Sequence, residues 1–236
     1  MPCVVTPPAP ASSCPTSTIP DIDGNPYNTV SIGTQCWTKE NLRVRRYNDG
    51  TEIRFDASGT STGTSSQTWN VSGREYGAHT IHSHDSTATT PSNLTSYGYL
   101  YNWYAAAGIV TSSGAPTKNI CPIGWHVPTD TEWTTLTTYL GGVTTAWTVM
   151  KKNDALWTTN TGTNTSGFSA LPGGARELDG SFGVFNPIRV YAVFWSSTLN
   201  SSGTLAWYRD LNASGGNVGK YTNDKSFGAS VRCLLD

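Results

Sequence analysis

The chain has 236 residues with nine Trp and eleven Tyr, and 36% of its residues are hydrophobic, which is enough apolar surface for a substantial core. Charged residues make up only 13%, against about 25% in ordinary soluble domains, and the formal net charge is -1 with no basic run beyond Arg43, Arg45 and Arg46. These values exclude a protein that binds a nucleic-acid backbone, and since no run of about 18 apolar residues occurs, we expect no membrane insertion.

Residues 1–20 are rich in Pro, Ser and Thr and contain few large apolar side chains. This composition is typical of an arm or linker with polyproline character and no core of its own. We therefore divide the chain into an N-terminal arm at 1–20 and a single domain at 21–236. The arm is a candidate contact for homo-oligomers or for attachment to a larger particle.

The segment after the arm alternates apolar and polar residues between turn residues. It predicts a hairpin with strands at 27–32 and 35–38 and a turn at Gly33. The preceding DIDGN at 21–25 lacks the acidic twelfth position of a calcium-binding EF-hand loop, so we interpret it as a tight turn.

Residues 51–96 form a long polar insertion, which in a compact domain is functional or poorly ordered. Within it, His79, His82 and His84 supply enough imidazoles for a transition-metal site. Their spacing fits neither a helix pair nor a hairpin of fixed register, so a solvated loop is the competing interpretation.

The next segment, YGYLYNWYAAAGIV at 97–110, places Tyr97, Leu100, Tyr101 and Tyr104 at helical spacing before Gly108. It predicts a buried helix whose aromatic stripe packs against a sheet.

The stretch CPIGWHVPTDTEW at 121–133 combines a buried strand with the start of a helix at 130–140. Thr129 is the expected N-cap, and Glu132 stands three residues later as its capping-box partner. His126 lies in the strand, where we expect a core histidine that is bonded to the backbone rather than a general base, because no nucleophile motif accompanies it.

The remainder of the chain consists of short apolar segments between Gly-rich turns. It predicts strands at 168–171, 181–185, 190–196, 204–211, 216–221 and 228–234. Two helices with many short strands make an α+β domain.

The five cysteines indicate an oxidising compartment, and hence an extracellular, cell-surface or particle-surface location. We expect one disulfide between Cys3 and Cys14 and another between Cys121 and Cys233, which would leave Cys36 buried or bonded to another chain. The alternative is that Cys36, Cys121 and Cys233 are reduced thiols in the core.

Several motifs occur in one order: DIDGNPYNTVSIGTQCWTKENL, YGYLYNWYAA, CPIGWHVPTDTEW, GFSALPGGAR, FWSST, AWYRDL and GASVRCLLD. Together they resemble the Fibrobacter succinogenes major paralogous domain over residues 21–236. The resemblance implies a C-type-lectin-like fold related to the formylglycine-generating enzyme, with two main helices on a twisted, mostly antiparallel sheet with long irregular loops. In that enzyme a pair of late cysteines is implied to hold copper, and here only Cys233 lies in the last hundred residues.

Residues 187–236 are the candidate ligand-binding or variable segment, and within it residues 198–227 mix Asn, Ser, Gly, Tyr and Trp in the manner of an antibody paratope. The resemblance implies that the late loops and strands form the binding face, and that in some relatives this segment is varied by diversity-generating retroelements. The competing interpretation is that Trp207 and Tyr208 pack inside and the Asn residues only make turns. Our candidate ligand contacts are Tyr191, Leu199, Asn200, Trp207, Asn212, Asn217, Tyr221, Asn223 and Asp224.

No cofactor is required by the sequence, although calcium is possible because lectin-like folds often hold it. Asp210, Asn217 and Asp224 are the candidate calcium ligands. Carboxylates for glycoside hydrolysis are present, but no spacing selects a pair. We therefore expect a non-enzymatic recognition module that binds a surface glycan or protein. The alternatives are a structural subunit of a surface appendage and a divergent enzyme of the formylglycine-generating fold.

Overall fold

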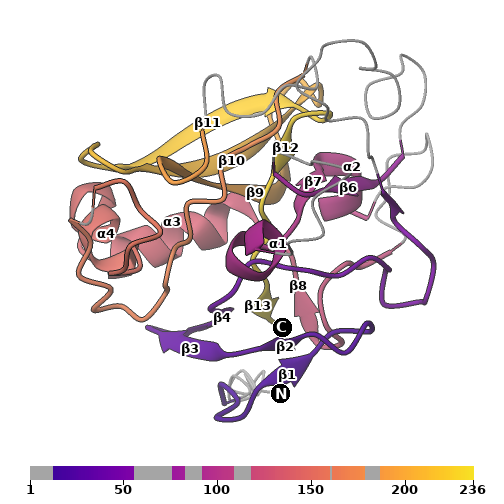
Figure 1. Cartoon of the computed structure of the whole chain (residues 1–236), viewed down its shortest axis with the longest axis horizontal. Coiled ribbons are helices and arrows are strands. Elements are labelled where there is room, and N and C mark those ends of the chain that lie inside the picture. The colour runs from indigo at the N-terminus through magenta and orange to yellow at the C-terminus, as the bar shows by residue number, and fades with distance from the viewer. Residues whose placement is uncertain (1–12, 56–75, 83–91, 109–117, 160, 179–186) are drawn as a thin grey trace, which may run out of the picture.

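The computed structural model describes residues 13–55, 76–82, 92–108, 118–159, 161–178 and 187–236. Within these ranges the chain forms four helices and thirteen short strands (Figure 1). The helices are α1 (Ser92–Tyr97), α2 (Trp103–Ala106), α3 (Asp130–Tyr139) and α4 (Val143–Met150). The strands are β1 (Ile19–Pro20), β2 (Pro26–Tyr27), β3 (Thr29–Ile32), β4 (Gln35–Thr38), β5 (Arg54–Phe55), β6 (Ala78–Thr80), β7 (Leu100–Asn102), β8 (Trp125–His126), β9 (Tyr191–Leu199), β10 (Leu205–Asn212), β11 (Val218–Asp224), β12 (Gly228–Ala229) and β13 (Leu234–Leu235).

The architecture is mixed α+β with mostly antiparallel sheets, as the sequence predicts. One sheet has the order β3-β4-β13-β8, so the C-terminal strand lies between the N-terminal hairpin and the strand that precedes α3. Leu234 of β13 pairs with Trp37 on one side and with His126 on the other. The hairpin of β3 and β4, with its turn at Gly33, confirms the expectation for residues 27–38.

Strand β9 separates two hydrophobic cores because successive side chains of a strand point to opposite faces. Ala192 and Phe194 lie in the core beneath α3 and α4, whereas Val193 and Trp195 lie in the core around α2 and β7. Figure 1 shows α3 and α4 along one face of the sheet β11-β10-β9. Buried aromatic rings fill this interior, and Trp133 stacks on Phe194 with centroids 5.6 Å apart.

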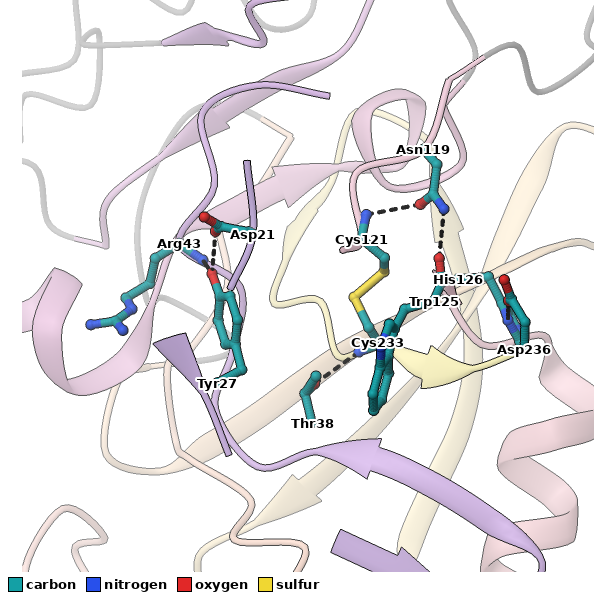
Figure 2. The surroundings of a disulfide bond; sticks show 10 residues. All are labelled: Asp21, Tyr27, Thr38, Arg43, Asn119, Cys121, Trp125, His126, Cys233 and Asp236. Carbon is teal, nitrogen blue, oxygen red and sulfur yellow. Dashed lines mark hydrogen bonds and ion pairs between the residues drawn. A yellow bond between two sulfur atoms is a disulfide. The ribbon is translucent and has the colours of Figure 1, made fainter. Parts of the chain in front are cut away.

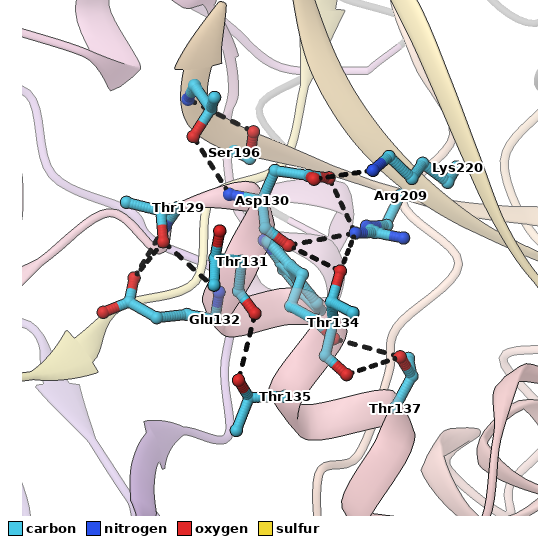
Figure 3. Close-up of polar contacts among 12 residues, drawn as sticks. Thr129, Asp130, Thr131, Glu132, Thr134, Thr135, Thr137, Ser196, Arg209 and Lys220 are labelled. Carbon is cyan, nitrogen blue, oxygen red and sulfur yellow. Dashed lines mark hydrogen bonds and ion pairs between the residues drawn. The ribbon is translucent and has the colours of Figure 1, made fainter.

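Helix α3 begins where the sequence predicts. Thr129 Oγ1 accepts a hydrogen bond from the Glu132 amide, and the Glu132 carboxylate accepts one from the Thr129 amide at 2.7 Å, which completes the capping box (Figure 3). The helix buries Trp133 and Leu136. The capping box depends on residues three apart, so the local sequence determines it.

His126 differs from the expectation of a core histidine bonded to the backbone. Its ring is half-buried and contacts two carboxylates, Glu132 Oε1 at 3.1 Å and Asp236 Oδ1 at 2.6 Å. The hydrogen bond with Glu132, together with the one to Asp236, raises the pKa of His126 against the opposing effect of burial. The side chain thus joins β8 to α3 and to the last residue of the chain (Figure 2 shows His126 beside Asp236).

The single buried helix expected over 97–110 is wrong. Helix α1 ends at Tyr97 because Gly98 adopts φ 77°, and a Cβ there would lie 2.7 Å from the Leu42 carbonyl oxygen. Leu100–Asn102 then pairs as β7, and the Asn102 side chain caps the short helix α2. Tyr97, Tyr99, Tyr101 and Trp103 are all buried and Tyr104 is partly buried, so the spacing of the aromatic residues does not indicate which face of a helix would be buried. Residues 109 and 110 lie outside the described residues.

Helix α4 was not expected, because its sequence VTTAWTVM is rich in β-branched residues. Ala146 and Met150 are buried four residues apart in the core beneath the sheet, so packing overrides the weak helix propensity. Of the expected late strands, those at 190–196, 204–211 and 216–221 correspond to β9, β10 and β11. The segment 168–171 makes an isolated bridge, 228–234 divides into β12 and β13, and 181–185 lies outside the described residues.

Two disulfides are present among the described residues. Cys121 bonds to Cys233, as expected, and Figure 2 shows Asn119 and Thr38 bonding the backbone on either side of it. Cys14 bonds to Cys36 and not to Cys3, so the expected Cys3–Cys14 pair is wrong. The hairpin places Cys36 of β4 beside the segment that carries Cys14, and the spacing of the cysteines in the sequence does not reveal this proximity. Cys3 itself lies outside the described residues.

No helix in the described part of the chain combines the length and apolar character needed to cross a membrane.

Candidate binding surface

The sheet β11-β10-β9 presents two chemically different faces. In the register of β10 with β11, Tyr208 pairs with Tyr221, Arg209 with Lys220 and Asp210 with Gly219. Because side chains alternate along a strand, Arg209 and Lys220 share one face, and Tyr208, Asp210 and Tyr221 share the other.

The inner face is held by the first turn of α3. Arg209 Nη2 donates to Asp130 Oδ1 at 2.6 Å, and Lys220 Nζ donates to Asp130 Oδ2 at 2.7 Å (Figure 3). The Arg209 side chain is only 3% exposed, so this ion pair is largely shielded from water. Carboxylate charge is also favourable near a helix N-terminus. Asp130 therefore fixes both strands of the β10–β11 hairpin to the helix layer.

The outer face carries a set of residues that we call the tyrosine face: Tyr191, Tyr208, Asp210, Gly219 and Tyr221. Tyr208 packs against the core through Trp195 and Phe227, with ring centroids 6.2 and 5.6 Å away.

Tyr221 lies across the strand from Tyr208 at 5.8 Å and is 53% exposed. A partly buried ring that packs on the core thus supports an exposed one, which gives the surface a rigid aromatic anchor.

Gly219 makes room for the polar centre of this face. A Cβ at Gly219 would lie 2.0 Å from Asp210 Oδ1 and 2.4 Å from the Tyr221 ring, so both side chains occupy the space above the glycine. Burial raises the pKa of Asp210 to about 6, although the Gly219 amide acts in the opposite direction.

The phenol of Tyr208 also has a raised pKa, and the main cause is again burial. Burial raises its pKa to about 12, and the nearby Asp210, Tyr221, Glu177 and Tyr191 add to the rise. The tyrosine face therefore offers phenol groups and one carboxylate at a single location.

The candidate ligand contacts divide between the two faces and the turns. Tyr191 and Tyr221 belong to the tyrosine face. Trp207 lies on the inner-face side, where Lys220 Nζ sits 4.5 Å from its ring centroid. Leu199 packs against the core around α2 and β7.

The polar candidates mostly serve turns. The side-chain oxygen of Asn200 accepts from the Leu205 amide, that of Asn212 from the Ser214 amide, and that of Asp224 from the Ser226 amide. These are the local Asx interactions of the competing interpretation.

Asn223 and Asn217 lie elsewhere on the hairpin. Asn223 Oδ1 accepts a hydrogen bond from the adjacent Asp224 amide, and Asn217 is exposed between β10 and β11.

The candidate calcium ligands are not brought together. Asn217 precedes β11 and Asp224 ends it, which separates them by about 20 Å at ~3.3 Å per residue. Asp210 lies opposite Gly219 on β10. Within the described residues no group of three or more His, Cys, Asp and Glu side chains is arranged to hold a metal ion.

The histidines of the insertion also diverge. His79 is buried against Tyr99, whereas the His82 ring lies beside Gly174, 2.8 Å from where its Cβ would be. His84 lies outside the described residues. The expected solvated loop does not describe His79 and His82, since both side chains are buried.

Tyr208 is not among the ligand contacts expected from the sequence, and the sequence did not predict that Asp210 and Tyr221 share one face. The signal was available in principle, because Tyr208 and Asp210 are two residues apart, as are Gly219 and Tyr221. An antiparallel pairing of the two segments places all four on one face.

Residues 30–234 match the family model described as the Fibrobacter succinogenes major domain. No curated protein and no solved structure matches the chain.

Proposed function

The chain belongs to the Fibrobacter succinogenes major domain family, and from this premise we propose that it is a non-catalytic recognition module that works outside the cytoplasm and binds a surface glycan or protein. The observation that carries the proposal is the tyrosine face, where exposed Tyr221 rests on partly buried Tyr208 beside Asp210. Tyr supplies large amphipathic contact area at a low cost in conformational entropy, which suits recognition of varied ligands.

The way the sheet is held supports this role. Asp130 ties Arg209 and Lys220 to α3, so the strands that carry the tyrosine face are already ordered before a ligand arrives. Pre-organisation of this kind improves affinity because less motion is lost on binding. The two disulfides support an oxidising, extracytoplasmic location.

We also propose a C-type-lectin-like architecture. Two main helices, α3 and α4, pack on an antiparallel sheet, and the first and last segments of the domain share another sheet. An experimental structure that fails to superimpose on lectin-like domains would remove this part of the proposal. The proposed absence of catalysis is supported by Cys233, which is the only cysteine of the last hundred residues and is bonded to Cys121, so the copper pair of the related enzyme has no counterpart.

The direct test is binding to arrayed glycans and purified surface proteins, in calcium and in chelator, for the native chain and for Tyr221→Ala. We expect the substitution to weaken binding by at least about tenfold, as for an exposed aromatic anchor. Tyr139→Ala is the matched control, because Tyr139 is a 66% exposed tyrosine on α3. Equal affinity of the Tyr221→Ala and native proteins would refute the tyrosine face.

The chelator arm examines calcium separately. Since the three candidate ligands are dispersed, we expect binding to survive chelation. Loss of binding in chelator would point to a calcium site outside the described residues.

A second candidate is a structural subunit of a surface appendage. The observation that favours it is that all four cysteines of the described residues are paired within the chain, while the fifth, Cys3, belongs to the arm. If Cys3 joins chains, non-reducing electrophoresis will show dimers that Cys3→Ser abolishes. If both the native chain and the Cys3→Ser protein run as monomers, the disulfide-linked structural subunit is excluded.

The segment 187–236 is also a candidate for genetic variation. Exposed Tyr221 and Asn217 are positions where side chains can change without disturbing the core. A template repeat and a reverse transcriptase in the neighbouring DNA would support variation, and their absence would exclude it.

A further inference from the structure

A cavity of about 840 Å³ opens beside strands β5 and β6, and it shares no residue with the tyrosine face. We call it the arginine pocket and define it by Arg45, Arg46, Glu52, Arg54, Phe55, His79 and Tyr99, which line it. Its volume lies within the range of small-ligand sites, which is about 300–1,000 Å³.

The pairing of β5 with β6 builds this pocket from distant parts of the chain. The two strands run parallel, with Arg54 opposite Ala78 and Phe55 opposite His79. The His79 ring then meets the edge of Tyr99, with centroids 4.6 Å apart, and lies 5.3 Å from Phe55. The result is an aromatic wall with an imidazole in it.

His79 is 1% exposed, and neither ring nitrogen has a well-aligned hydrogen-bond partner within the described part of the chain, although the backbone of Arg54 and Ile53 lies close to the ring. Burial lowers the pKa of His79 to about 4, although nearby backbone groups of Arg54 and Ile53 act to raise it. The ring is therefore neutral at physiological pH, with one donor and one acceptor nitrogen. A buried polar group with a poorly aligned partner is costly, and a ligand hydroxyl can either donate to its acceptor nitrogen or accept from its donor nitrogen.

The arginines around the pocket are incompletely neutralised. Arg46 pairs with Asp23 at 2.6 Å, but Arg45 reaches the same carboxylate only at 4.0 Å and its side chain is 66% exposed. Arg54 donates to the Tyr76 hydroxyl at 2.7 Å and makes no ion pair with a described carboxylate.

Among the described residues, the carboxylates of Asp23 and Glu52 balance two of these three guanidinium groups, which leaves one positive charge at the pocket. Guanidinium groups with unused donors favour carboxylates, which they bind through paired hydrogen bonds.

We propose that the arginine pocket binds an acidic saccharide, with the carboxylate on Arg45 and Arg54, a hydroxyl group on His79 and the sugar ring against Phe55. The arginines, His79 and the aromatic wall each contact a different part of such a ligand. A neutral sugar offers the arginines no carboxylate for a charge-assisted hydrogen bond, and an inorganic anion has no apolar ring face for the aromatic wall.

The test is calorimetric titration of the full chain with tri-galacturonate, with its methyl ester, and with inorganic phosphate. The ester keeps the sugar and removes the charge. We expect the acid to bind at least about tenfold more tightly than the ester or phosphate, since a tenfold ratio corresponds to about 1.4 kcal/mol, the scale of one charge-assisted hydrogen bond. Equal binding of acid and ester, equal binding of phosphate, or no binding of the acid at millimolar concentration would each overturn the proposal.

Substitutions locate the site. We expect Arg45→Gln and Arg54→Gln each to weaken binding of tri-galacturonate by about tenfold, and His79→Phe to weaken it while filling the same buried space. Arg189→Gln is the control, because it removes the same charge at an exposed position outside the pocket.

Tyr221→Ala should leave binding of tri-galacturonate unchanged. The proposal for the arginine pocket can therefore be refuted independently of the proposal for the tyrosine face. Unchanged affinity in both arginine variants would place the saccharide elsewhere.

Discussion

Arg232 is completely buried, and its guanidinium group is satisfied by four acceptors. It donates to Asn41 Oδ1 at 2.7 Å and to the backbone oxygens of Thr38, Phe168 and Ser169 at 2.8 to 2.9 Å. A single side chain thereby joins three separate segments of the chain near the end of the domain.

We expect Arg232→Met to destabilise the fold by roughly 3–5 kcal/mol, because the substitution leaves several buried acceptors without donors. Arg232→Lys keeps the charge but loses the planar fork, so it should be nearly as damaging. Urea unfolding followed by tryptophan fluorescence measures both. A loss below about 1 kcal/mol for Arg232→Met would show that the acceptors find other partners.

His79 and His82 predict a loss of stability in acid. Burial lowers the pKa of each to about 4, while the unfolded chain has about 6.5. Between these values the unfolded state binds more protons than the folded state, so stability is retained above pH 6.5 and lost as the pH falls through 4.

The expected loss between pH 7 and pH 5 is on the order of 2 kcal/mol for each histidine. Asp210 offsets part of it, because its raised folded pKa makes the folded state bind more protons between about 3.8 and 6. Urea unfolding at the two pH values checks the prediction, with His79→Phe as the variant that should show a smaller pH dependence. Parallel pH profiles for the native and variant chains would contradict a buried neutral His79.

At the scale of elements, the junction between α3 and the β10–β11 hairpin is the contact that positions the tyrosine face. Thr129 and Glu132 stabilise the helix start, whereas Asp130 reaches across to Arg209 and Lys220. Neighbouring residues of one helical turn thus have separate local and long-range roles.

We expect Thr129→Ala to cost ~1 kcal/mol, the usual value of an N-cap. Asp130→Ala should cost more, ~3 kcal/mol, because it leaves the buried Arg209 charge without its carboxylate. Thr131→Ala, an exposed change in the same turn, is the control. Hydrogen exchange should rise in β10 and β11 for Asp130→Ala only. Equal exchange in the Thr129→Ala and Asp130→Ala proteins would mean that the ion pairs do not hold the hairpin.

The helix expected over 97–110 differs from the structure of the described residues 92–108. The aromatic spacing fits a helix, but Gly98 ends α1 and Asn102 starts α2, so a strand lies between them. In a segment that is buried on most sides, apolar and polar residues do not alternate with a helical period. Helix α3 has one buried and one exposed face, so its apolar residues do recur with that period.

At the scale of the whole molecule, the two disulfides close loops of very different size. Cys121 and Cys233 are 112 residues apart, and Cys14 and Cys36 are 22 apart. In the chain-entropy treatment these separations correspond to roughly 5 and 3 kcal/mol of stabilisation. The larger loop contains α3, α4 and the whole β9–β11 sheet.

We expect the two bonds to be reduced in sequence. Cys121 and Cys233 are at most 1% exposed, whereas Cys14 is only partly buried, so mild reductant should open Cys14–Cys36 first. Alkylation and mass spectrometry over time will identify the order. The double change Cys121→Ser with Cys233→Ser should lower the unfolding midpoint more than Cys14→Ser with Cys36→Ser. The reverse order of reduction would show that the large-loop disulfide is the accessible one.

The sequence by itself determined the α+β class, the family resemblance, the hairpin at Gly33 and the capping box of α3, because each depends on residues close together in the chain. It also indicated the Cys121–Cys233 pair, which the structure confirms.

Only the tertiary structure decided the partner of Cys14, the face on which Trp207 lies, and the assembly of Arg45, Arg54 and His79 around one cavity. These depend on strand register and on parallel pairing between distant segments. A shift of one residue in register exchanges the two faces of a strand, and the local sequence does not fix that choice.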